Sequence, residues 1–271
     1  MTDPDWWPQV NKAFFEGDLA TAEALLLAKL KDDPRLDSMP RGRVNAANIL
    51  MAAGHWSLVD GLLPNGTNFF RTSGWLGSLQ AGWPVDAQGG PLPWLTYPAM
   101  DFLEPRIDPA WSVLEWGCGT STIWWSQRVA KVTSIENDPV WYDRVRAFLP
   151  PHCAIAWEST AERYVGAARG GSYDVIVIDG AWRNECAAAV ADLPARLIVF
   201  DNTDTKANTP GTRTLMDAGW QRLDFFGLIP SFAYKNCTSL FYKDASVLRA
   251  ARLPSEMRLS SGPTCSQALG S

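Results

Sequence analysis

The residues best suited to chemistry lie in the segment Glu-Trp-Gly-Cys-Gly-Thr-Ser, which begins at Glu115. Gly117 and Gly119 follow an apolar stretch, and a helix is expected to begin near Ser121. Glycines let a backbone approach a ligand closely, and the first N–H groups of a helix attract anions. The next strand-like stretch ends at Glu136, where a carboxylate can accept both hydroxyls of a ribose. The pattern predicts a nucleotide-type site.

Two kinds of nucleotide ligand compete for this pattern. A dinucleotide-binding turn has a third glycine where this chain has Thr122. The turn is entered through an acid, and it resembles motif I of the class I S-adenosylmethionine (SAM)-dependent methyltransferases. The resemblance implies that the turn, including Ser121, holds the methionine part of SAM, and that Glu115 organises its amino end. It also implies that Glu136 binds the ribose and that Asn137 borders the adenine. A nicotinamide site and a turn without a ligand are the alternatives.

A second group of polar residues follows two later strand-like stretches: Asp179, Asp201 and Asn202. The carboxyl ends of parallel strands face the ligand crevice, and an all-oxygen set suits Mg²⁺. The arrangement is similar to the metal triad of the catechol O-methyltransferases and their caffeoyl-CoA relatives. That resemblance implies an ion that binds a substrate hydroxyl and lowers its pKa. In the competing interpretation, Asp201 and Asn202 end a strand and Asp179 lines the SAM pocket.

The chain departs from that family at the position of its proton-accepting lysine, where it has Trp182, followed by Arg183. Arginine is a poor base but a good clamp for anions. We therefore expect Asp179 and Arg183 to take part in the reaction, and the identity of the base and the need for metal stay open. Ahead of the first strand, Trp94 or Tyr97 is expected to cover the cofactor.

The elements that must position these residues alternate between strand-like and helix-like patterns. The alternation predicts an α/β fold with a doubly wound, mostly parallel, seven-stranded sheet. The final two strands have no helix-length connection, so they are expected to pair antiparallel at one edge. The expected strands cover residues 112–116, 132–136, 154–157, 173–178, 197–200, 222–227 and 239–243.

The chain is expected to divide into a helical module (1–66), a linker rich in Gly and Pro (67–92), the methyltransferase-like domain (93–245) and a polar tail (246–271). Four short helices with tight breaks suggest two stacked helical hairpins in the module. Its segment from Gly17 to Leu26 loosely resembles a tetratricopeptide unit. A partner-binding surface, a dimerisation surface and a packing cap are the roles open to it.

Composition narrows the partners. The chain of 271 residues carries a formal charge of −5, with no basic cluster denser than Arg41–Arg43, so we expect no nucleic-acid partner. No apolar run reaches the ~18 residues that span a bilayer, and no secretory signal is recognisable. The five cysteines are scattered, which favours reduced thiols in the cytoplasm.

The sequence therefore predicts a SAM-dependent methyltransferase that methylates a hydroxyl of a small molecule such as a sugar, phenol or polyketide-type metabolite, with Mg²⁺ as a second cofactor if the oxygen set is used. Metal-independent N- or O-methylation is one alternative. A SAM-binding scaffold that recruits a protein through the helical module is the other.

Overall fold

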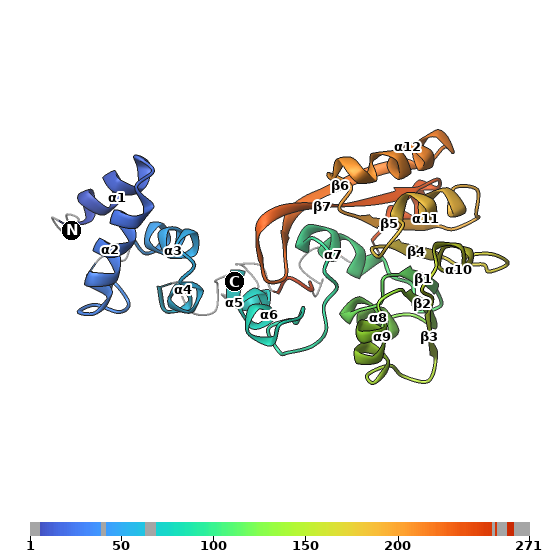
Figure 1. Cartoon of the computed structure of the whole chain (residues 1–271), viewed down its shortest axis with the longest axis horizontal. Helices are drawn as coiled ribbons and strands as arrows, with labels where there is room; N and C mark the ends of the chain where they lie inside the picture. Colours follow the sequence, from blue (N-terminus) through green and yellow to red (C-terminus); the bar gives the residue numbers. More distant parts are fainter. Residues whose placement is uncertain (1–5, 39–41, 63–68, 251–252, 254–258, 263–271) are drawn as a thin grey trace. The chain divides into compact units, whose positions relative to one another are not determined.

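The computed structural model describes residues 6–38, 42–62, 69–250, 253 and 259–262 (Figure 1). The chain divides into two compact units, with the boundary between Thr72 and Ser73. No helix in the described ranges is both long enough and apolar enough to cross a membrane.

The first unit is helical, as the sequence predicted. Asp18 caps the second helix by accepting a hydrogen bond from the Thr21 N–H at 3.0 Å. Apolar residues at helical spacing, including Val10, Leu26 and Ile49, have no exposed surface and form a core of their own. The helices are α1 (Trp7–Phe15), α2 (Leu19–Leu30), α3 (Arg43–Ala52), α4 (Trp56–Leu62) and α5 (Phe69–Thr72).

The segment expected as a linker, residues 67–92, is structured where it is described. Its first part contains α5, and the remainder opens the second unit with α6 (Trp75–Ala81). Trp75 and Leu92 are each only 1% exposed, so this stretch is part of the second unit's core. The sequence did not predict these buried positions, because the segment is rich in Gly and Pro and its irregular backbone has no periodic apolar pattern.

The second unit is built on one seven-stranded sheet with the order β3-β2-β1-β4-β5-β7-β6. The first five strands are parallel, and β7 runs antiparallel between β5 and β6. The predicted fold class, a doubly wound and mostly parallel seven-stranded sheet with a helical N-terminal region, is confirmed. The strands are β1 (Ser112–Trp116), β2 (Lys131–Glu136), β3 (Cys153–Trp157), β4 (Val175–Ile178), β5 (Leu197–Asp201), β6 (Gln221–Ile229) and β7 (Phe232–Tyr242).

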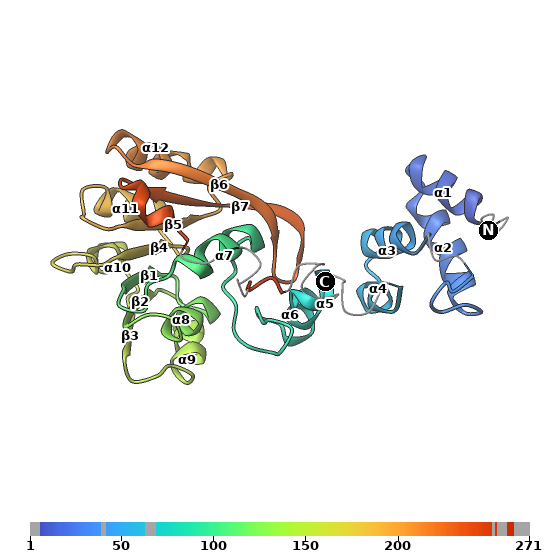
Figure 2. The same ribbon diagram turned by 180° about the vertical axis from the view of Figure 1, so that it is seen from behind.

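Helices cover both faces of the sheet (Figures 1 and 2). The chain runs from β1 to β2 and β3 on one side of the sheet, and it then crosses back to form β4 and β5 on the other side of β1. Because such crossovers are right-handed, this reversal places α8 and α9 on one face and α10, α11 and α12 on the other. Alternate side chains of the central strands, such as Trp116 and Phe200, are fully buried in the core between the sheet and α10, α11 and α12. The helices are α7 (Tyr97–Leu103), α8 (Thr120–Ser126), α9 (Pro139–Arg146), α10 (Ala161–Gly166), α11 (Arg183–Val190) and α12 (Thr209–Asp217).

The β6–β7 hairpin extends beyond the rest of the sheet (Figure 1). Two tryptophans hold its tip: the Trp75 indole donates to the Phe232 carbonyl at 3.0 Å, and the Trp94 indole to the Pro230 carbonyl at 3.1 Å. The start of α7 packs closely against the hairpin, since a Cβ at Gly227 would lie 2.7 Å from Pro98 Cδ. The hairpin is therefore fixed against the segment that precedes the first strand.

The tail expected beyond Ala245 is described only in part. A short 3₁₀ turn spans Ala245–Leu248, and the short segment 259–262 lies against α7, where Ser261 donates to Asp101 at 2.5 Å. Residues 251–252, 254–258 and 263–271 of the predicted tail lie outside the described ranges.

Candidate functional site

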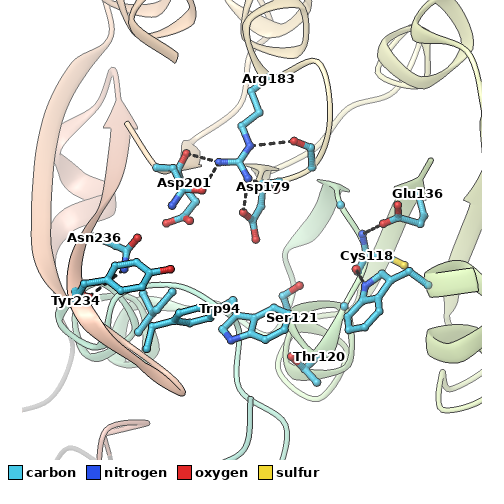
Figure 3. A pocket seen from close by; sticks show the side chains of 17 residues that line it. Trp94, Cys118, Thr120, Ser121, Glu136, Asp179, Arg183, Asp201, Tyr234 and Asn236 are labelled. Atoms are coloured by element: carbon cyan, nitrogen blue, oxygen red, sulfur yellow. Dashed lines mark hydrogen bonds and ion pairs between the residues drawn. The ribbon is translucent and has the colours of Figure 1, made fainter. Parts of the chain in front are cut away.

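A cavity of about 390 Å³ lies at the carboxyl ends of β1, β4 and β5 and reaches the hairpin (Figure 3). Two acids and an arginine, Asp179, Asp201 and Arg183, lie at its centre. We call its two ends the turn side and the hairpin side. The turn side comprises the glycine turn 117–121, Glu136 and Trp141; the hairpin side comprises Trp94, Ile229, Phe232, Tyr234 and Asn236.

The two predicted glycines of the turn have different roles. Gly117 has φ +94°, and a Cβ there would lie 2.7 Å from the backbone N and Cα of Gly180. It therefore permits the ends of β1 and β4 to touch. Gly119 has an extended backbone, and a Cβ there would meet nothing nearer than Ser121 Oγ at 3.5 Å. Since this residue lines the cavity, its missing side chain leaves room for a ligand.

Glu115 lies beneath the turn and has no exposed surface. Its Oε2 accepts hydrogen bonds from the hydroxyls of Thr122 and Ser134, the latter at 2.8 Å. The Thr122 hydroxyl in turn accepts from the Gly119 N–H at 3.0 Å. Burial raises the pKa of Glu115 to about 7, and its Oε1 has no hydrogen-bonding partner among the described residues. The residue shapes the turn from below and does not line the cavity.

Glu136 reaches the cavity and organises the backbone around it. Its Oε2 accepts from the Cys118 N–H at 3.0 Å, and its Oε1 accepts from the N–H groups of Asn137 and Asp138, each at 2.8 Å. A carboxylate has about four lone-pair sites, so about one is left for a ligand. The Trp141 indole holds the same Cys118 peptide from its other end, donating to the carbonyl at 2.5 Å.

Besides Glu115, two more of the expected cofactor contacts do not line the cavity. Tyr97 is the first residue of α7 and is only 2% exposed; burial raises its pKa. Asn137 contributes its backbone to the site, donating its N–H to Glu136 and accepting the Trp157 indole N–H at 3.2 Å. Of the two residues expected to cover the cofactor, Trp94 lines the cavity and Tyr97 does not.

Arg183, the first residue of α11, binds the ends of β4 and β5 together (Figure 3). Its Nε donates to the Gly180 carbonyl at 2.9 Å. Its Nη1 donates to the Asp201 carbonyl at 2.9 Å and to Asn202 Oδ1 at 2.6 Å, and its Nη2 donates to the Asp179 carbonyl at 2.5 Å and to Asp179 Oδ1 at 3.1 Å. A guanidinium has five N–H donors, and all five are used by the chain itself. Arg183 is a clamp between strand ends, and the anion clamp expected from the sequence has no free donor.

The two central acids have strongly perturbed pKa values. Burial raises the pKa of Asp179 to about 7, against the opposing effect of the Arg183 guanidinium. Burial, followed by the nearby charge of Asp179, raises the pKa of Asp201 well above its usual range. Asp201 is 3% exposed, and its Oδ1 accepts from the Thr238 hydroxyl at 2.5 Å. Asp179, with its side chain 20% exposed, is the acid more open to the cavity.

The predicted Mg²⁺ set does not fit these contacts. Asp179 Oδ1 and Asn202 Oδ1 both accept from Arg183, and Asp201 Oδ1 accepts from Thr238. A guanidinium and a divalent cation compete for the same oxygens, and their charges repel each other. Within the described ranges, no group of three or more His, Cys, Asp or Glu side chains could hold a metal ion.

The hairpin side is an aromatic wall, and of its residues the sequence analysis placed Trp94 at the site. The Trp94 ring is nearly parallel to that of Trp141, with centroids 6.1 Å apart and planes at 15°, and its centroid lies 6.2 Å from that of Phe232. Tyr234 is 59% exposed, and Asn236 lies beside it with its amide donating to the Tyr234 carbonyl at 3.2 Å. The count of 14 tryptophans indicates aromatic surfaces, but no local pattern links Phe232 or Tyr234 to the turn.

No protein-family model and no curated protein matches the chain. Solved structures with a similar fold include a precorrin-6y C5,15-methyltransferase from Geobacter metallireducens, with a TM-score of 0.44 and 16% identity over 54% of this chain and 87% of that one. A spermidine synthase from Thermotoga maritima has a TM-score of 0.47 and 13% identity, covering 64% of this chain and 68% of that one. A TehB-like SAM-dependent methyltransferase from Corynebacterium glutamicum has a TM-score of 0.41 and 14% identity, covering 63% and 94%. These likenesses are distant and concern the fold alone.

Proposed function

We propose that this protein is a SAM-dependent methyltransferase that methylates a hydroxyl group of a small molecule without using a metal ion. The observation that carries the proposal is the continuity of one cavity. At one side it has a glycine turn beside a carboxylate on the neighbouring strand. At its centre it has a carboxyl group with a pKa near 7, and at the other side an aromatic wall.

The turn side suits the nucleoside and methionine parts of SAM. Gly119 leaves open space next to the turn, and Glu136 keeps about one acceptor site for a ribose hydroxyl. Glu115 acts indirectly, because its hydrogen bond to Thr122 positions the Gly119 peptide. When bound, SAM supplies a methyl carbon attached to a sulfonium.

Asp179 is the residue best placed to remove the acceptor's proton. A base works best when its pKa lies near the working pH, and burial brings Asp179 to about 7. Arg183 fixes the orientation of this carboxylate through Oδ1. The aromatic wall orients the acceptor so that its oxygen lies near Asp179, and such positioning supplies much of the rate in a methyl transfer.

The first test is binding. Isothermal titration calorimetry of the full chain with S-adenosylhomocysteine (SAH) and, separately, with NAD⁺ should show binding of SAH alone. Binding of NAD⁺ with no response to SAM or SAH would refute the proposal.

The second test is turnover with labelled SAM and a panel of phenols and sugars. Methyl transfer should be unchanged in excess EDTA, because each side chain of the expected metal set already has a partner at Oδ1: Arg183 at Asp179 and Asn202, and Thr238 at Asp201. Activity that is lost in EDTA and restored by Mg²⁺ would show that the metal-free mechanism is wrong, while leaving methyl transfer intact.

A further inference from the structure

The charge of the cavity restricts which acceptors can enter it. Its lining residues include three acids, Glu136, Asp179 and Asp201, and one cation, Arg183. In the part of the chain that the structure describes, no other Lys, Arg or His lines the cavity. None of these acids can neutralise a negatively charged acceptor, although burial raises the pKa values of Asp179 and Asp201 and so lowers their own negative charge.

The single cation cannot compensate an acceptor's negative charge. Arg183 gives each of its five N–H donors to oxygens of the chain, so it offers none to a ligand. An anion that loses water without gaining a cationic partner is strongly disfavoured. Acceptors carrying phosphate or carboxylate groups do not match this site.

The aromatic wall favours flat molecules and tolerates positive charge. Trp94 is held by its bond to the Pro230 carbonyl and lies near the rings of Trp141 and Phe232, so the wall is preformed. Aromatic ligands pack well against such rings, and their π faces also attract cations. Tyr234 extends the wall and is the most exposed of its rings.

Taking the proposed methyltransferase function as its basis, we infer that the acceptor is an aromatic molecule without negative charge, and that a neutral or ammonium-bearing side chain on its ring is accepted at the hairpin side. The inference rests on the saturated Arg183, the surplus of carboxylates and the aromatic wall.

Three phenols that differ in one group test this inference: tyramine with an ammonium tail, tyrosol with a neutral hydroxyl tail and 4-hydroxyphenylacetate with a carboxylate tail. Calorimetry of each with the SAH-loaded full chain should show tyramine and tyrosol binding at least tenfold more tightly than 4-hydroxyphenylacetate. Equal or tighter binding of the carboxylate, or no binding of any of the three, would overturn the inference. Failure of SAH itself to bind would instead count against the proposed function.

A charge-reversal variant gives an independent test. Tyr234→Arg places a free guanidinium on the hairpin side, and it should tighten 4-hydroxyphenylacetate and weaken tyramine by at least fivefold each. Phe226→Arg is the matched control: it adds the same charge at a 52% exposed position of β6 that does not line the cavity. SAH should bind both variants as it binds the wild type. Identical responses of the two variants to the phenols would show that charge on the hairpin side does not select the acceptor.

Discussion

The two glycines of the turn can be separated experimentally, because one serves the fold and the other serves the ligand. A Cβ at position 117 would lie 2.7 Å from Gly180 in a backbone with φ +94°. The left-handed conformation costs an L-residue roughly 1–2 kcal/mol, and overpacking adds about 1–3 kcal/mol. Gly117→Ala should therefore reduce the free energy of unfolding by roughly 2–5 kcal/mol.

Gly119→Ala should leave the fold almost unchanged. Its backbone is extended, and the nearest atom to a new Cβ is Ser121 Oγ at an ordinary contact distance of 3.5 Å. The stability change should stay within about 0.5 kcal/mol, as for an unstrained surface substitution. The new methyl would occupy the space beside the turn, so the affinity for SAH should fall by about tenfold or more, which corresponds to about 1.4 kcal/mol.

Thermal unfolding and calorimetry measure the two effects on the same samples. For a domain of this size, about 1 kcal/mol shifts Tm by roughly 2–4 °C. Gly117→Ala should thus lower the Tm of the second unit by roughly 4–20 °C, whereas Gly119→Ala should move it by less than about 2 °C. Wild-type SAH affinity in Gly119→Ala would refute the ligand role of the turn. A wild-type Tm in Gly117→Ala would refute the close approach of β1 and β4.

Three other substitutions test the acids and the clamp. Asp179→Asn should lower the rate of methyl transfer about 10²–10⁴-fold without loss of SAH binding. The wild-type rate should rise with pH through about 7, because the base must be ionised. A pH-independent rate would exclude Asp179 as the base. Burial raises the pKa of Glu115 from 4.5 to about 7, so the folded state holds this proton to higher pH than the unfolded state does. The stabilisation that this bound proton gives is complete below pH 4.5 and is lost as the pH rises to about 7. The free energy of unfolding should fall by up to about 3 kcal/mol over that range. Urea unfolding of Glu115→Gln should show a smaller decline over that range, and an unchanged slope would contradict the assignment. Arg183→Ala should free side-chain oxygens that then bind Mn²⁺, which electron paramagnetic resonance detects. Mn²⁺ binding at the same place in the wild type would show that Arg183 does not exclude metal ions.

Much of the fold could be predicted because its signals are local. The predicted strand 112–116 matches β1, and the antiparallel pairing of the final two strands is confirmed. The insertion of β7 between β5 and β6 was not predicted, since the order of strands depends on which edges pair across the chain. The predicted linker concealed α6, whose Trp75 is recognisable as core only once its burial is known.

The candidate site shows the same division. The sequence by itself determined the residue types and the strand ends that bring the glycine turn, Glu136, Asp179 and Asp201 to one edge of the sheet, because parallel strands carry their carboxyl ends to the same side. It could not reveal that Glu115 is buried beneath the turn or that the hairpin adds the aromatic wall.

Only the tertiary structure decided the chemistry at the centre of the cavity. An oxygen set of Asp and Asn suggests a metal when it is considered alone, but Arg183 binds the side chains of Asp179 and Asn202, and Thr238 binds that of Asp201. The donor from which an oxygen accepts a hydrogen bond depends on the distances between segments that are far apart in the chain. Only the folded structure establishes those distances.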